Sequence, residues 1–198
     1  MPLKLLSSGG GSVLLTANTT AADFTVNVPA VNGNMVTTAD TGSITQSMLG
    51  AGVYAAYGPA FHAHRTTSDQ TGTQNTYVKV QFNAKDFDTA SCYDSTTNYR
   101  FTPNVAGYYY FYATVINSPS SGTQTQLVTR FYKNGGATGG VGNLVLSSGI
   151  GGGTGVSFSQ LLYLNGSTDY VEVYAYSTAA VPTYQQLSCF GGYLARAA

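Results

Sequence analysis

Apolar and polar residues alternate in short runs along most of this chain. Near the N-terminus the clearest run is residues 24–29, where Phe24, Val26 and Val28 share one face before Pro29 ends the pattern. From residue 58 onward such runs recur about every 8–12 residues with turn residues between them, as in a β-sandwich or barrel. We predict strands at residues 60–65, 77–82, 99–101, 107–116, 127–132, 144–146, 156–164, 170–176 and 186–194.

Two of these runs carry aromatic side chains where a wet sheet face would carry polar ones. In residues 107–116, tyrosines alternate with Tyr109 and Phe111, and residues 170–176 repeat the arrangement. We therefore predict that one face of each strand meets the core and the other meets a second copy of the chain. The alternative is a broad sandwich that covers both faces within one chain. The predicted interface residues are Tyr108, Tyr110, Tyr112, Tyr170, Tyr174 and Tyr176.

The chain changes character near residue 58. Residues 1–57 contain few large apolar side chains, and an isolated hairpin is marginally stable in water. Their alternation nevertheless indicates a segment that another chain completes. Residues 58–198 have the length of one compact domain. We predict an all-β protein, in which an extended, β-rich segment (1–57) precedes a globular domain (58–198).

The low content of charged residues excludes several classes of function. Only 8% of the 198 residues are charged, against ~25% in a typical protein, and eight basic residues balance eight acidic ones. A nucleic-acid partner needs clustered Lys and Arg, and a polybasic membrane anchor needs the same. No segment supplies ~20 consecutive apolar residues, and residues 1–12 are too polar for a signal-peptide core. We expect neither a nucleic-acid nor a membrane partner, and no signal peptide.

Candidate chemistry is sparse. His62 and His64 fall on one face of a strand, but no third metal ligand is indicated, so we predict no metal site. Asp86 and Asp88 are interpreted as solvated loop charges, with calcium binding as the alternative. No nucleophile or phosphate-binding motif occurs, so we predict neither an enzyme nor a cofactor. The glycine-rich residues 134–155 are expected to form a long loop, either a plain connection or a binding loop.

The two cysteines, Cys92 and Cys189, fit no metal-binding spacing. We interpret them as free buried thiols. A disulfide between them is the alternative, which the sequence cannot test because it does not give their separation.

The larger part resembles a known family. Phe82, Asp88, Tyr93, Phe101 and the Gly-Tyr-Tyr-Tyr-Phe of residues 107–111 are similar to the signature of the complement C1q-like globular head, a relative of the tumour necrosis factor jelly roll. Residues 59–63, 132–135, 169–173 and 190–194 resemble its opening strand, mid-domain hairpin, Asp-x-Val-x-Val strand and closing strand. The resemblance implies a ten-stranded jelly-roll sandwich that trimerises through aromatic and apolar strand faces.

Residues 1–57 resemble the N-terminal attachment segment of bacteriophage fibres and other virion proteins, through residues 3–13, 24–29 and 32–33. The combination implies a homotrimeric phage tail fibre or adhesin, assembled in the host cytoplasm and carried on the virion. Its head would recognise a host-surface receptor, for which a glycan is one candidate. The attachment segment would bind tail, baseplate or capsid proteins through Leu3, Leu5, Phe24, Val26 and Val28.

Two other interpretations remain open at this point. A capsid decoration or head-fibre protein would need the same anchor and trimer but would have a purely structural role. A bacterial surface or matrix protein could carry the same fold.

Overall fold

The computed structural model describes residues 3–6, 9, 12–15, 58–66 and 68–198. The chain divides into two compact units, residues 1–43 and 44–198. In the first, β1 (Leu3–Leu6) pairs antiparallel with β2 (Ser12–Leu15), so that Leu3 lies opposite Leu15. Leu3 and Leu5 therefore lie on a strand. Residues 16–57 lie outside the described residues. The predictions for Phe24, Val26 and Val28, and the predicted border between residues 57 and 58, therefore stay predictions.

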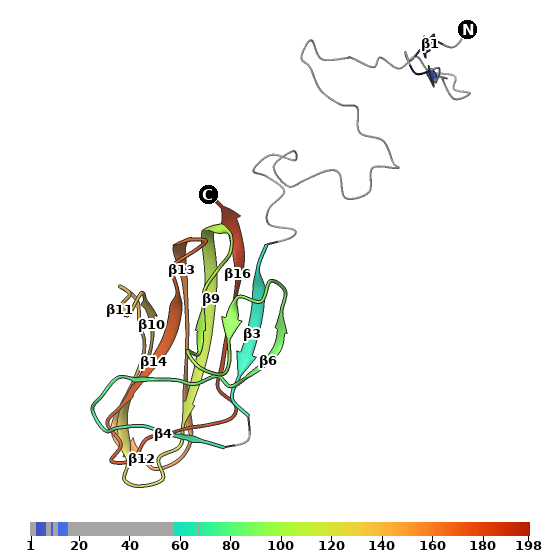
Figure 1. Ribbon diagram of the computed structural model, residues 1–198. Helices are drawn as coiled ribbons and strands as arrows, with labels where there is room; N and C mark the ends of the chain where they lie inside the picture. The colour runs from blue at the N-terminus through green and yellow to red at the C-terminus, as the bar shows by residue number, and fades with distance from the viewer. Residues whose placement is uncertain (1–2, 7–8, 10–11, 16–57, 67) are drawn as a thin grey trace, which may run out of the picture. The chain divides into compact units, whose positions relative to one another are not determined.

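The described part of the second unit is a sandwich of two antiparallel sheets, which confirms the all-β prediction (Figure 1). The β9 sheet has the order β4-β15-β9-β16-β3-β6, with β13 also paired to β9. Its strands are β3 (Ala60–His64), β4 (Gln70–Thr71), β6 (Ala84–Asp88), β9 (Ala106–Asn117), β13 (Thr154–Asn165), β15 (Thr183–Tyr184) and β16 (Cys189–Ala197).

The β10 sheet has the order β11-β10-β14-β8-β7, with β12 paired to β10 and β5 paired to β14. Its strands are β5 (Val78–Lys79), β7 (Tyr93–Asp94), β8 (Arg100–Phe101), β10 (Gln124–Lys133), β11 (Gly136–Ala137), β12 (Gly142–Ile150) and β14 (Val171–Ser177). Each of the nine predicted runs contains or overlaps one strand. The two seven-stranded sheets exceed the expected ten strands because several are two residues long, too short to show a period in sequence.

The expected long loop at residues 134–155 is wrong. Most of this stretch is strand, because β12 pairs with β10 from Gln124 opposite Ile150 to Thr129 opposite Gly142. Glycine lacks a β-carbon and weakens the alternation that identifies a strand, which is why the sequence pattern failed here. The hairpin at its start is as predicted: Asn134 and Gly135 take φ values of 53° and 77°, as a type I′ turn requires.

Aromatic rings fill the space between the sheets. Phe61 on β3 stacks on Phe101 of β8 with a centroid distance of 4.6 Å, and it meets Phe190 of β16 edge-on at 4.9 Å. All three are fully buried. Because each buried ring contributes ~1.5–3 kcal/mol, this cluster stabilises the packing of the two sheets against each other.

A polar network closes one end of the core. The Asn117 amide donates to Gln124 Oε1 at 2.7 Å and to Ser177 Oγ at 3.1 Å, and Asn117 Oδ1 accepts from the Thr183 backbone N–H. All three interior side chains are fully buried, so their mutual hydrogen bonds offset the cost of burying polar groups. The network joins the last residues of β9 and β14 to the first residue of β10.

Candidate functional site

The two faces of β9 differ completely in exposure. Tyr109, Phe111, Ala113 and Val115 point into the core and are buried. The alternating residues on the outer side are exposed or half-buried, and Tyr108 is 43% exposed. β9 therefore has one aromatic face in the core and a second one on the surface.

The surface side of the β9 sheet carries a group of large side chains that we call the open tyrosine face. Register places Tyr108 opposite Tyr163 and Tyr110 opposite Leu161 on β13, while Tyr193 of β16 lies beside Tyr110. The ring centroids are 5.5 Å apart for Tyr108 and Tyr163 and 5.7 Å for Tyr110 and Tyr193. The residues of this face are Tyr108, Tyr110, Tyr112, Leu161, Tyr163 and Tyr193.

Exposure on this face is unusual for such large groups. Leu161 is 54% exposed, Tyr193 48% and Tyr163 43%. A contiguous exposed patch of apolar side chains commonly marks a contact surface with another molecule. Leu161, Tyr163 and Tyr193 were not among the predicted interface residues. These three residues do alternate with inward-facing ones on β13 and β16. Serine and glycine at the neighbouring outer positions make that alternation hard to recognise in the sequence.

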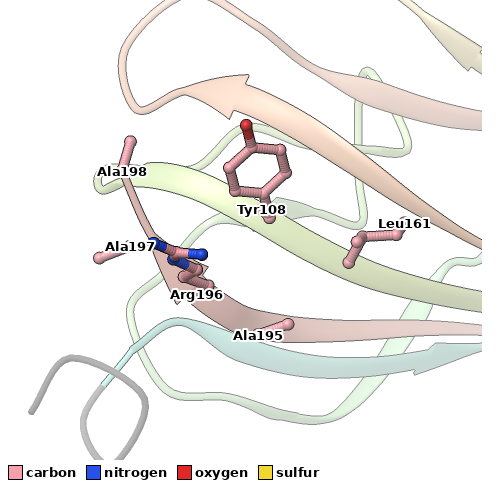
Figure 2. A pocket seen from close by; sticks show the side chains of 6 residues that line it. All are labelled: Tyr108, Leu161, Ala195, Arg196, Ala197 and Ala198. Carbon is pink, nitrogen blue, oxygen red and sulfur yellow. The ribbon is translucent and has the colours of Figure 1, made fainter. Parts of the chain in front are cut away.

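A cavity of about 450 Å³ opens at one end of the open tyrosine face (Figure 2). Tyr108 and Leu161 line it together with the last residues of β16, including Arg196. Its lining is largely apolar, and Arg196 is the one cation labelled in it. A cavity of this size accepts one or two bulky side chains from another molecule.

The other three predicted interface residues lie elsewhere. Tyr170, Tyr174 and Tyr176 belong to β14 or precede it directly, on the outer side of the β10 sheet. The structure therefore does not bring all six predicted tyrosines together. It groups Tyr108, Tyr110 and Tyr112 on one sheet and places Tyr170, Tyr174 and Tyr176 on the other.

The β14 tyrosines stay half-buried but pack against other side chains of their own chain, and we call this region the closed tyrosine face. The rings of Tyr174 and Tyr132 stack at 4.0 Å, and Tyr77 packs on Tyr176 at 5.4 Å. The hydroxyl of Tyr176 donates to Asn75 Oδ1. The guanidinium carbon of Arg100 lies 4.2 Å from the Tyr170 ring centroid. Sequence reasoning missed Tyr77 and Tyr132 because both come from separate segments that only the fold brings together.

An ion pair fixes the centre of the closed tyrosine face. Glu172 is 5% exposed, and its carboxylate accepts from Lys79 Nζ at 2.9 Å. Lys79 also donates to the backbone carbonyl of Asn98. Burial raises the pKa of the neighbouring Tyr174, and the charge of Glu172 raises it further. The ion pair thus neutralises Glu172 within a surface whose side chains bond to one another.

His62 and His64 lie on β3, and both rings face Asp86 of β6 at distances of 3.5 Å and 3.4 Å. Asp88 does not share this position. It accepts from the backbone N–H groups of Cys92 and Tyr93 and from Lys85 Nζ, so it is a structural carboxylate and not a solvated loop charge. Burial acts to raise the pKa of Asp88, but these donors together lower it below the ordinary value.

Both cysteines are free thiols, as interpreted from the sequence, although only Cys92 is fully buried. Burial raises the pKa of the Cys92 thiol, which keeps it protonated and unreactive. Among the residues that the structure describes, no group of three or more His, Cys, Asp or Glu side chains is arranged to hold a metal ion. The described part of the chain likewise contains no helix long and apolar enough to cross a membrane.

The described sandwich matches solved structures of tumour necrosis factor proteins. The Eiger TNF of S. frugiperda aligns with a TM-score of 0.51 and 14% identity, over 71% of this chain and 94% of that one. The chain thus has a tumour necrosis factor-like jelly-roll fold, as the sequence predicted. Murine APRIL aligns with a TM-score of 0.48 and 11% identity, over 69% of this chain and 98% of that one. No protein-family model and no curated protein matches the chain.

Proposed function

We propose that the protein is a non-enzymatic structural protein of a bacteriophage particle, a short homotrimeric tail fibre. Its jelly-roll head contacts the host surface, and residues 1–57 attach it to other virion proteins. The observation that carries the proposal is the open tyrosine face. A single chain leaves Leu161 and three tyrosine rings about half exposed, and neighbouring copies of the chain would bury them.

The composition of the open tyrosine face suits association between identical chains. Tyrosine offers a large apolar area and a hydroxyl that can stay hydrated or bonded. Next to the face on β9 and β13 lie neutral groups such as Thr114 and Ser157, whose hydroxyls lie 2.8 Å apart. Few charges have to be desolvated when the face is covered, so apolar burial is not offset by ion desolvation.

Residues 1–57 are proposed as the attachment segment on different grounds. Their described part is the β1–β2 hairpin, and a lone two-stranded hairpin is marginally stable. Contacts with another virion protein would supply the missing layer. The host-contacting surface is proposed to be on the head, with a neutral glycan as one candidate receptor, because the chain has too few charges to bind an ionic one strongly.

The mass of the purified full chain in solution tests the assembly. We expect three times the chain mass of 20.7 kDa, and a monomer at micromolar concentration would contradict the proposal. Localising the protein in electron-microscopy maps of the particle tests the role. Density at the tail supports a fibre, whereas density on the capsid shell would replace the receptor role with a decoration role.

A further inference from the structure

Two separate places on the outer side of the β9 sheet carry complementary groups. The first is the cavity of about 450 Å³, which lies over β13, β9 and the end of β16 and includes Arg196 in its lining (Figure 2). The second is on β6, where the ring of Phe87 is 49% exposed and follows Asp86. Because β6 is the last strand of the sheet beyond β16 and β3, these two places lie toward opposite sides of one sheet.

A bulge in the β3–β6 pairing places Asp86 and Phe87 on the same side of the sheet. The register shifts after His62, which leaves Asp86 as an extra residue in β6. The rings of Phe87 and His62 lie 6.4 Å apart, and Nε2 of His62 lies 3.5 Å from the Asp86 carboxylate. Nδ1 of His62 is in turn 2.9 Å from the Tyr112 hydroxyl. Both β6 side chains therefore lie on the side of the open tyrosine face.

Arg196 lacks a partner within its own chain. Among residues 58–66 and 68–198, it is the one Lys or Arg side chain with no hydrogen bond, ion pair or ring contact. The others bind a carboxylate, an uncharged oxygen or a tyrosine ring: Arg65, Lys79, Lys85, Arg100, Arg130 and Lys133. An exposed guanidinium that lines a largely apolar cavity is suited to bind a carboxylate from another molecule.

Asp86 is the acidic residue that matches this cation. Its side chain is 55% exposed, and its nearest polar groups are the imidazoles of His62 and His64 at 3.5 Å and 3.4 Å. Asp69 is exposed as well, but it lies near Arg65 in the loop after β3. Three other acidic residues pair with lysines: Asp88, Asp169 and Glu172. Asp86 thus combines an exposed carboxylate with an exposed aromatic ring at the next position.

We infer that Phe87 of one copy enters the cavity of the next copy, where Asp86 pairs with Arg196. This inference rests on the proposed assembly through the open tyrosine face. A closed ring of identical chains is built from heterologous contacts, in which one patch of each chain meets a different patch of the next. The β9 sheet carries two such patches, a ring beside a carboxylate on β6 and an apolar cavity beside a cation at the end of β16.

The apolar contact and the charged contact contribute in different ways. Insertion of the Phe87 ring removes apolar surface from water, and an aromatic side chain in a pocket is the kind of contact that dominates interface affinity. The charges determine which patches meet. Two cavities in contact would bring two Arg196 side chains together, and two β6 strands would bring two Asp86 carboxylates together. Repulsion therefore favours contact between unlike patches.

A charge swap tests the pairing, with assembly of the full chain measured by sedimentation. Arg196→Glu should raise the concentration at which half of the chain is assembled by about tenfold or more, because two carboxylates then meet. Asp86→Lys should have a similar effect, because two cations then meet. The double variant with both changes should return to within about threefold of the wild-type chain, since an opposite-charge pair is restored.

Arg196→Glu combined with Asp69→Lys is the matched control. It has the same net charge as the swapped double variant but leaves Asp86 in place, so it should assemble as weakly as Arg196→Glu alone. Equal recovery in both double variants would overturn the pairing, because net charge alone would then account for the recovery. Absence of recovery in the swapped variant would overturn it as well.

Phe87→Ala tests the apolar contact without introducing a charge. It should raise the half-assembly concentration by about tenfold or more. Leu187→Ala is the control, since Leu187 is 75% exposed in the loop before β16 and belongs to neither patch. Equal effects of the two variants, or no effect of Phe87→Ala, would overturn the insertion of Phe87.

The wild-type chain separates this inference from the proposed assembly. A wild-type chain that is monomeric at micromolar concentration would overturn the assembly itself, and the inference with it. A wild-type oligomer that Arg196→Glu, Asp86→Lys and Phe87→Ala all leave equally strong would overturn the inference alone.

Discussion

The open and closed tyrosine faces begin from the same sequence pattern and end with different neighbours. On β14, Tyr174 and Tyr176 are packed by Tyr132 and Tyr77, and Lys79 neutralises Glu172 on the same face. On β9, the exposed ring of Tyr108 and the half-buried ring of Tyr110 pack on Tyr163 and Tyr193, which are themselves exposed. Alternating tyrosines therefore indicate that a strand has a second aromatic face. Whether the chain packs further rings of its own against that face depends on where remote segments fold.

The largest expected effect comes from placing a charge in the middle of the open tyrosine face. Leu161→Asp should weaken self-association by more than about a hundredfold, because association would then bury an unpaired carboxylate. Sedimentation of the variant and of the wild-type chain measures the change. Val145→Asp is the control, since Val145 is 67% exposed on β12 of the other sheet. Equal loss of assembly in both variants would show that the open tyrosine face is not the interface.

The second largest effect is expected on the closed tyrosine face, where a substitution should lower the stability of the folded chain and not its assembly. Lys79→Met removes the partner of the buried Glu172. Breaking such a pair costs ~3–5 kcal/mol when it is fully buried, and the partial exposure of Lys79 reduces this to ~2–3 kcal/mol. Chemical denaturation measures the free energy of unfolding. An unchanged value would mean that water already screens Glu172.

Removing a covering ring should have a smaller effect of the same kind. Tyr77→Ala should lower the free energy of unfolding by ~1–3 kcal/mol, from lost ring contacts and the exposure of apolar surface beneath them. Tyr193→Ala on the open tyrosine face is the comparison. It should leave the stability of the isolated chain within about 0.5 kcal/mol while weakening assembly. If Tyr193→Ala lowered stability and Tyr77→Ala weakened assembly, the closed tyrosine face and not the open one would be the interface.

The smallest expected effect is the loss of stability at low pH that depends on Asp88. The pKa of Asp88 is lowered in the folded chain, so its stabilising contribution is present above the ordinary carboxyl pKa of about 4 and is lost as the pH falls through the lowered value. Asp88→Asn should flatten this part of the stability profile by ~1 kcal/mol or less. Thermal unfolding at a series of pH values measures it, and an unaltered profile would show that Asp88 contributes no such linkage.

Much of the fold could be predicted because its strands obey simple alternation. β9 places Tyr109 and Phe111 inward as its pattern indicates, and the Asn134–Gly135 turn follows from the conformations that these residues tolerate. β12 could not be predicted at its full length, because its glycines weaken the alternation that marks a strand. Only its pairing with β10 shows where it begins and ends. The six predicted interface tyrosines lie on two different sheets. Which sheet a strand joins depends on long-range pairing, which a local sequence pattern does not reveal.

β13 has a practical consequence for anyone producing this protein. It is a twelve-residue strand paired with β9 along one side, and no described strand pairs with its other side. An edge of this length offers a row of unpaired backbone groups to any similar edge. With no net charge on the chain at pH 7, little electrostatic repulsion keeps unassembled heads apart. Heads that accumulate at high concentration should therefore tend to associate edge to edge through β13.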